Sequence, residues 1–279
     1  MKLFVEIKSR EELNTINSYG YVISVSSVSS SPFNITLDDA LDILNNSNGK
    51  NIYLKLNLLY HDKDYPIVLD YVKKMYPMLT GIIFQDLGLV TLFEQNNIKL
   101  DLIYDPGTFN TVYEDTLFFK DTSISTISLS REISLSEIDA FLKNKKEMCY
   151  LYHAYGHMLM FYSLRKHFTN FRLHEESFPI IKDDYNVYLK EETRNEFYPA
   201  YEDKHGFFIY RDEVINIYKY IDHFDNIDYL MLDRPYISDS EYKDTISLYN
   251  GLIDYTEYKK KYPDQTDGYF FKVMGVKPR

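Results

Sequence analysis

Short apolar runs alternate with polar-capped amphipathic stretches along most of the chain, and the apolar runs predict strands. Between most of these runs lie helical patterns with short connections, which is typical of βαβ units and a parallel sheet. Eight parallel strands predict an α/β fold, a (β/α)8 barrel of the TIM type. The predicted strands cover residues 3–7, 21–25, 51–58, 81–85, 100–104, 124–129, 148–153 and 228–232.

Capping patterns mark the starts of several predicted helices. A serine or threonine is followed three residues later by an acid at Ser9, Thr36 and Ser134, which is the pattern of a capping box. Further helices are expected over residues 66–76, 89–96, 213–224 and 240–260. The serine-rich run at residues 26–31 is expected to be a solvated loop.

The alternation of strands and helices changes after the seventh predicted strand. Residues 186–192, 198–203 and 207–210 predict three short antiparallel strands joined by turns. We therefore expect a single barrel domain over residues 1–279, in which residues 185–211 form a small antiparallel β-meander inserted before the last strand.

Charge and cysteine content narrow the possible functions. The formal net charge of −11 argues against this chain gripping nucleic acid unaided, because phosphate binding needs clustered Lys and Arg. The single cysteine, Cys149, excludes an internal disulfide and any four-cysteine metal or iron–sulfur site within one chain. No apolar run approaches ~18 residues and the N-terminus lacks a signal-peptide pattern, so we expect a cytoplasmic protein without a membrane partner.

Polar residues follow directly after several predicted strands, where the working face of a barrel lies. An arginine there can hold a carboxylate or phosphate in two-point contact, and a glutamate can act as a general base or bind a cation. A surface ion pair, or an acid favoured at the start of a helix, explains Arg131 and Glu132 equally well. The residues at these strand ends are Asp86, Asp105, Arg131, Glu132, His153 and Asp233.

Residues 147–171 combine an apolar strand, a break at Gly156 and a polar cluster that begins at Ser163. A strand that opens through a glycine onto polar groups is a common way to build a site, and a core strand followed by an exposed basic helix is the alternative. His153 and His157 lie four apart but lack an HExxH pattern, so we expect no metal site. Ser163 lacks a G-x-S-x-G elbow, which favours a hydrogen-bonding or capping role over that of a nucleophile.

This segment resembles the signature of the U32 peptidase family, in the short form of low-GC Gram-positive bacteria. The glycine, serine and arginine of that signature fall on Gly156, Ser163 and Arg165, whereas its histidine falls on Tyr155, with His153 two residues earlier. Further stretches that resemble the family are residues 84–89, 104–111, 129–138 and 189–210.

The resemblance implies a barrel-like fold and two kinds of activity. Some members are described as collagenase-like peptidases, and others act in the prephenate-dependent hydroxylation of the tRNA wobble uridine. Longer members carry an iron–sulfur cluster, but two of its cysteine positions fall here on Leu159 and Lys166, so no cluster is expected. The short members resemble partners of a longer paralogue in tRNA hydroxylation.

Three hypotheses remain open at this point. The first is a barrel that supports tRNA hydroxylation with a longer U32-family paralogue, binds a small carboxylate such as prephenate and meets tRNA only through the partner. The second is a U32-type peptidase, and the third is a non-catalytic interaction module, favoured by Tyr155 in place of histidine. The candidate catalytic residues are Glu132, His153 and Ser163, and the candidate binding residues are Asp86, Asp105, Arg131, Tyr155, Gly156, Arg165, Arg194 and Glu202. For Arg194 and Glu202, exposed hairpin charges are the alternative.

Overall fold

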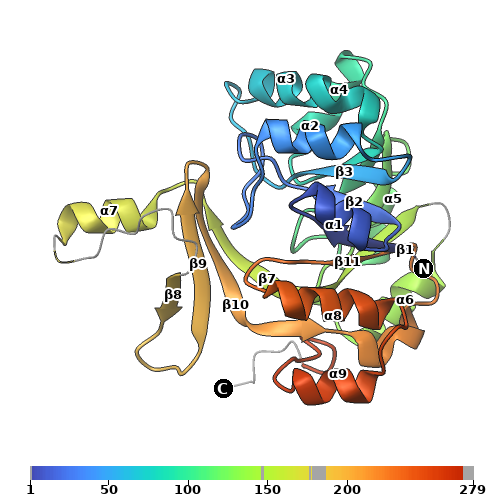
Figure 1. Ribbon diagram of the computed structural model, residues 1–279, viewed down its shortest axis with the longest axis vertical. Coiled ribbons are helices and arrows are strands. Elements are labelled where there is room, and N and C mark those ends of the chain that lie inside the picture. Colours follow the sequence, from blue (N-terminus) through green and yellow to red (C-terminus); the bar gives the residue numbers. More distant parts are fainter. Residues whose placement is uncertain (1, 146–147, 176, 178–186, 273–279) are drawn as a thin grey trace.

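Eight parallel strands close into a ring in the computed structural model, which describes residues 2–145, 148–175, 177 and 187–272. The ring closes because β11 pairs with both β1 and β7, and helices lie around its outside (Figure 1). The predicted barrel is confirmed. Its strands are β1 (Lys2–Glu6), β2 (Gly20–Ile23), β3 (Asn51–Leu56), β4 (Gly81–Phe84), β5 (Asp101–Tyr104), β6 (Ile124–Ser128), β7 (Cys149–Ser163) and β11 (Tyr229–Leu232).

The helices begin where the capping patterns predict. The side chains of Ser9, Thr36 and Ser134 each accept a hydrogen bond from a backbone N–H in the first turn of a helix. Apolar faces of the helices and the outward faces of the strands form the main hydrophobic core. The helices around the ring are α1 (Arg10–Thr15), α2 (Leu37–Asn45), α3 (Tyr65–Met75), α4 (Gly88–Gln95), α5 (Tyr113–Leu117), α6 (Leu135–Lys143), α8 (Asp239–Tyr249) and α9 (Tyr255–Lys261).

An arm projects from the barrel between β7 and β11 (Figure 1). It consists of the outer half of β7, from Tyr155 on, and α7 (His167–His174), β8 (Val187–Lys190), β9 (Phe197–Asp203) and β10 (Gly206–Asn216). β10 pairs antiparallel with β7 on one side and with β9 on the other, and β9 pairs with β8. The predicted antiparallel insertion before the last strand is thus confirmed, although its expected residues 185 and 186 lie outside the described part of the chain.

Two predicted boundaries near the arm are wrong. β7 was expected to end at His153, but it continues to Ser163 because its second half pairs with β10. The helix expected over residues 213–224 starts later, since Val214 and Ile215 belong to β10 and pair with β7. Only the 3-10 helix Tyr218–Phe224 remains of it.

Most of the serine-rich run is buried rather than solvated, which corrects the expectation for residues 26–31: residues 28–31 are buried, and Ser26 and Ser27 are half-buried. Ser29 and Ser30 are almost fully buried because β9 of the arm covers the loop after β2. Ser30 Oγ donates to Asp203 Oδ2 at 2.6 Å and lies 2.9 Å from the hydroxyl of Tyr201. Serine hydroxyls here satisfy buried polar groups between barrel and arm, which is a role that composition alone does not reveal.

The lower half of the barrel interior is filled by apolar side chains. The buried members pack as one cluster inside the ring, with Tyr19 and Tyr229 partly buried against it. Such a layer is the packed core expected in a barrel of this size. Its buried members are Phe4, Val22, Tyr53, Ile83, Ile103, Leu151 and Met231, and we call them the floor layer.

Candidate active site at the barrel mouth

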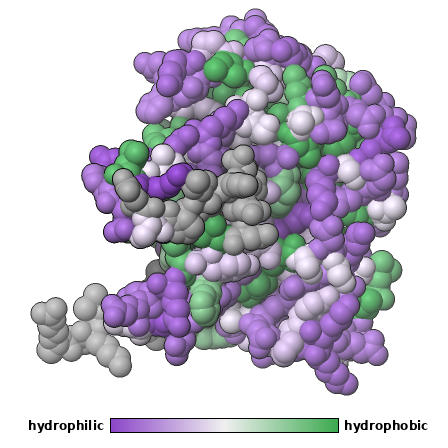
Figure 2. All heavy atoms as spheres, turned by 60° about the vertical axis from the view of Figure 1, so that its left-hand side comes forward, coloured by the Kyte–Doolittle hydropathy of each residue, from purple (hydrophilic) through white to green (hydrophobic). Residues whose placement is uncertain are grey.

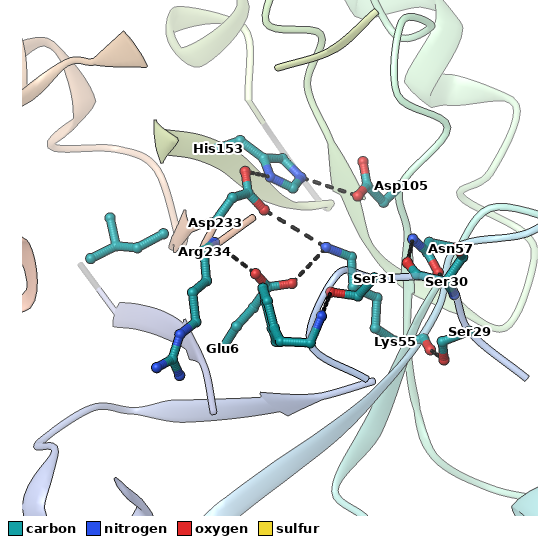
Figure 3. Close-up of polar contacts among 12 residues, drawn as sticks. Glu6, Ser29, Ser30, Ser31, Lys55, Asn57, Asp105, His153, Asp233 and Arg234 are labelled. Atoms are coloured by element: carbon teal, nitrogen blue, oxygen red, sulfur yellow. Dashed lines mark hydrogen bonds and ion pairs between the residues drawn. The ribbon is translucent and has the colours of Figure 1, made fainter. Parts of the chain in front are cut away.

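Charged side chains from several strands face one another at the mouth of the barrel (Figure 3). Successive side chains of a strand point to opposite faces, so the residue two positions after an inward apolar residue also points inward. This step leads from Phe4 to Glu6, from Tyr53 to Lys55, from Ile103 to Asp105, from Leu151 to His153 and from Met231 to Asp233. We call these five charged residues the mouth layer.

His153 lies between two carboxylates at the centre of the mouth layer. Its Nδ1 is 2.7 Å from Asp233 Oδ2, and its Nε2 is 3.1 Å from Asp105 Oδ2. Burial alone would lower the pKa of His153, but the charges of Asp233 and Asp105 raise it to about 9. Although burial opposes ionisation of the two carboxyl groups too, the His153 imidazolium keeps the pKa of both below the usual range. His153 is therefore a cation at neutral pH, which opposes a role as general base.

Lys55 supplies a second cation on the other side of Asp233. Its Nζ is 2.8 Å from Glu6 Oε1 and 3.8 Å from Asp233 Oδ1. The backbone N–H of Arg234 holds the other oxygen of Glu6 at 2.7 Å. Burial opposes the charge of Lys55, but Glu6 and Asp233 raise its pKa, so the ammonium group stays protonated in a largely enclosed position.

Arg131 joins the mouth layer from the loop after β6 and connects it to β7. Its Nη2 donates to Asp233 Oδ2 at 2.9 Å and to the carbonyl of Tyr155 at 3.1 Å. Its Nε and Nη1 donate to the carbonyls of His153 and His157, both at 3.3 Å. The guanidinium thus satisfies backbone groups at the place where β7 leaves the ring. Its expected contact with a ligand carboxylate stays a prediction.

Gly156 allows β7 to pass close to Asp233. Its φ is +112°, a conformation that side-chain-bearing residues rarely adopt. A Cβ at this position would lie 2.8 Å from the carbonyl oxygen of Asp233 and 2.9 Å from its Cβ. The glycine is therefore required by the backbone geometry that holds β7 against the mouth layer.

A cavity of about 340 Å³ lies between the mouth layer and the arm. Its base is ionic, with three cations, Lys55, Arg131 and His153, against two carboxylates, Asp105 and Asp233. Its walls include the loop after β5 and the outer half of β7, with apolar and aromatic side chains from both. The wall residues on these two segments are Pro106, Gly107, Thr108, Phe109, His157, Met158, Leu159, Met160, Phe161 and Tyr162. We call this space the mouth cavity.

Three candidate residues near the strand ends do not line the mouth cavity. Asp86 accepts hydrogen bonds from the Tyr65 hydroxyl and from two backbone N–H groups, and so holds the start of α4. Tyr155 is buried on the outside of the barrel, where its hydroxyl donates to Glu241 at 2.8 Å. Glu132 lies half-buried in the loop before α6. Their predicted roles in binding or catalysis stay predictions.

Four further candidates lie on the arm, apart from the mouth layer. Ser163 Oγ accepts from the backbone N–H of Arg165 and lies 3.1 Å from His167 Nε2. Glu202 accepts from backbone N–H groups in the first turn of α7. Arg194 forms an exposed ion pair with Glu191 in the turn between β8 and β9.

Two members of the mouth layer, Glu6 and Lys55, were absent from the candidates drawn from the sequence. Both lie inside predicted strands rather than just past their ends. The available signal was a charged residue at an inward position two residues after an aromatic one, in an otherwise apolar strand. That signal requires the inward face of each strand to be known.

Within the described residues, no three or more His, Cys, Asp or Glu side chains are grouped so that they could hold a metal ion. Over the same part of the chain, no helix is both long and apolar enough to cross a bilayer.

Comparison with known proteins places the chain in a family. The profile described as Peptidase family U32 matches residues 32–272. No curated protein matches the sequence. Among solved structures, N-(5'-phosphoribosyl)anthranilate isomerase from Pyrococcus furiosus is similar, with a TM-score of 0.42 and 14% identity over 55% of this chain and 76% of that one. Since the family profile covers most of the sequence, the barrel with its charged mouth belongs to peptidase family U32.

Proposed function

We propose that the mouth cavity binds a small organic carboxylate, and that this chain supports prephenate-dependent hydroxylation of the tRNA wobble uridine together with a longer U32-family paralogue. The observation that carries the proposal is Lys55, a cation that is 12% exposed and lines the mouth cavity. The family assignment and the resemblance to short members of the hydroxylation type support the choice of reaction.

Among the charged side chains that line the cavity, three are cations and two are carboxylates, and Glu6, which pairs with Lys55, does not line it. The carboxylates of Asp105 and Asp233 are both compensated by the His153 imidazolium, and Asp233 also by Arg131. Lys55 can therefore donate to a ligand carboxylate without leaving Asp233 unpaired. The apolar wall formed by Met158 and its neighbours can cover the carbon skeleton of the same ligand.

A peptidase is the second candidate, and one contact on the arm favours it. Ser163 and His167 form a hydroxyl–imidazole pair at 3.1 Å, which is the reach needed for an activated nucleophile. The pair is exposed, however, and it lies outside the mouth cavity. We therefore rank the peptidase below the binding of a carboxylate.

Calorimetric titration with prephenate tests the leading proposal. Lys55→Gln should weaken binding by roughly 30- to 150-fold, equivalent to about 2–3 kcal/mol, because a charge-assisted contact in a largely enclosed site is lost. The double variant Lys55→Gln/Glu6→Gln removes both partners of the ion pair, so no buried acid is left unpaired. It should bind prephenate as weakly as Lys55→Gln, which would show that the loss of affinity comes from the missing ammonium group and not from the unpaired Glu6. Lys260→Gln, an exposed substitution on α9, is the control. Equal affinity in wild type and both Lys55 variants would contradict the proposal.

Three further measurements separate the alternatives. The modified wobble uridine should decrease in tRNA from cells that lack the gene. Gelatin cleavage that disappears in Ser163→Ala, without prephenate binding by the wild type, would replace this proposal with the peptidase. If neither activity is found, a pull-down for the longer paralogue tests the interaction module.

A further inference from the structure

The arm carries a cluster of exposed cations on a protein whose net charge is −11. Residues 163–174, which contain α7, include Arg165, Lys166 and Arg172 but no acidic residue, and all three cations are exposed. Because acidic groups dominate the rest of the chain, this stretch is a local reversal of the average charge. Such clustering, rather than net charge, determines where a polyanion can bind.

A second cavity, of about 250 Å³, adjoins this stretch at the rim of the barrel. Leu164 lines the cavity directly before Arg165. The turn that contains Lys204 and His205 lies beside the same place, because the next residues of β10 pair with the end of β7. The histidines and the residues with charged side chains that line this rim cavity are His61, Lys63, Asp64, Lys204 and His205.

Most neighbouring acids already accept hydrogen bonds from the protein. Glu202 accepts from the N-terminal turn of α7, and Asp203 accepts from Ser30 Oγ and from the backbone N–H of His205. Asp64 accepts from the backbone N–H of His61 at 3.1 Å. Asp62 is exposed beside Lys63. These hydrogen bonds hold the carboxylates in place but leave them charged, and the exposed Glu175 directly follows the stretch, so the excess of cations is confined to residues 163–174. On the side of the molecule that Figure 2 brings forward, hydrophilic residues lie beside hydrophobic ones.

Aromatic side chains connect the rim cavity to the mouth cavity. Tyr162 lines both cavities, and the adjacent Phe161 lines the mouth cavity with 42% of its surface exposed. Proteins commonly bind single-stranded nucleic acid with cations placed along its sugar–phosphate backbone and exposed aromatic rings on which its bases stack. An RNA strand on the arm would therefore have a base within reach of the mouth cavity.

We propose that the rim cavity and residues 163–174 form a surface for the sugar–phosphate backbone of single-stranded RNA, with Phe161 stacking on a base at the entrance of the mouth cavity. The inference deepens the proposed function and rests on it for the reaction at the mouth. It revises the expectation, drawn from the net charge, that tRNA meets this chain only through a partner, because here the RNA contacts this chain directly in addition to a partner.

Fluorescence anisotropy with a labelled single-stranded RNA of about 12 nucleotides tests the surface on the intact protein. Arg165→Ser/Lys166→Ser should weaken binding by about tenfold or more at about 50 mM salt, because two phosphate contacts are lost. The slope of log affinity against log salt should become shallower by about 1.4, or ~0.7 per contact. The matched control is Lys243→Ser/Lys260→Ser, which removes two exposed lysines from α8 and α9.

Phe161→Ala supplies an independent measurement, since it should weaken RNA binding about tenfold while leaving the salt slope unchanged. The surface assignment is overturned if wild type does not bind RNA, or if the control pair loses as much affinity as the arm pair. Displacement of RNA by polyaspartate at equal charge concentration would also overturn it, and would indicate an acidic protein as the partner instead.

Prephenate titration of the same variants separates this inference from the proposed function. Arg165→Ser/Lys166→Ser should bind prephenate like the wild type, because neither residue lines the mouth cavity. Intact prephenate binding without RNA binding would reject the RNA surface alone. RNA binding without prephenate binding would reject the mouth ligand and leave the surface in place.

Discussion

Five strands of the barrel each contribute one side chain to the floor layer and, two residues later, one to the mouth layer. The two layers are nevertheless held by different kinds of interaction. The floor side chains are apolar and buried, and Phe4 makes edge contacts with Tyr53 and Tyr229 at ring-centre distances of 4.7 and 5.1 Å. The mouth side chains are ionic, and His153 reaches a carboxylate with each ring nitrogen.

This difference indicates a division of roles within one barrel. Burial of apolar area stabilises the floor without requiring a particular partner for each residue. An ion cluster contributes little net stability compared with apolar packing, because desolvation opposes the attraction. The mouth layer is therefore best explained by what it binds.

Removing a floor ring should have the largest effect on folding. Phe4→Ala should lower the free energy of unfolding by about 4 kcal/mol, because Phe4 is fully buried and the surrounding rings can close the cavity only in part. Denaturant unfolding monitored by circular dichroism measures the change. A loss below about 1 kcal/mol would show that the floor is not the stabilising layer.

The mouth layer should make stability depend on pH. Because the pKa of His153 is raised from 6.5 to about 9, its contribution is fully present below about pH 6.5 and is lost as the pH rises through about 9. We expect a decrease of about 2–3 kcal/mol across this window in the wild type. His153→Gln should remove the decrease, whereas His223→Gln, an exposed substitution, should retain it. A flat wild-type profile between these pH values would contradict the ion cluster.

The connection between mouth and arm should be sensitive to a single methyl group. Gly156→Ala should cost about 2 kcal/mol, since both its φ of +112° and the contact with Asp233 oppose a Cβ. Gly251→Ala, at φ +70° with open space around it, should cost only about 1 kcal/mol. Thermal unfolding of the two variants side by side measures the difference, and equal values would remove the argument for close packing at Gly156.

The sequence predicts the barrel well because each ring strand is an apolar run bounded by capping or turn residues. Thr36 and Ser134 mark helix starts by chemistry that acts within four residues, so no distant contact is needed to recognise them. Asp105 and Asp233 could be placed at the mouth by the same local reasoning, because each directly follows a strand that ends there. His153 was placed there by the same rule, although β7 continues past it to Ser163.

Features that depend on distant partners could not be predicted in the same way. The burial of Ser30 depends on Asp203, which is 173 residues away. The continuation of β7 beyond His153 depends on β10, and so does the failure of the predicted helix over residues 213–224. Predicting Glu6 and Lys55 as mouth residues would have required knowing which face of each strand points inward, and that is determined by how the ring closes.

The uninterrupted course of β7 from ring to arm has a consequence for how the family can vary in length. The pairing of β7 with β11 shifts register between His153 and Tyr155, so Tyr155 faces outward although it lies two residues after the inward His153. A one-residue deletion between His153 and His157 would disturb this shift and exchange inward and outward positions in the rest of the strand. The turn at residues 191–196, between β8 and β9 of the arm, is exposed along its whole length. Insertions should therefore accumulate in that turn across the family, while the spacing within β7 stays constant.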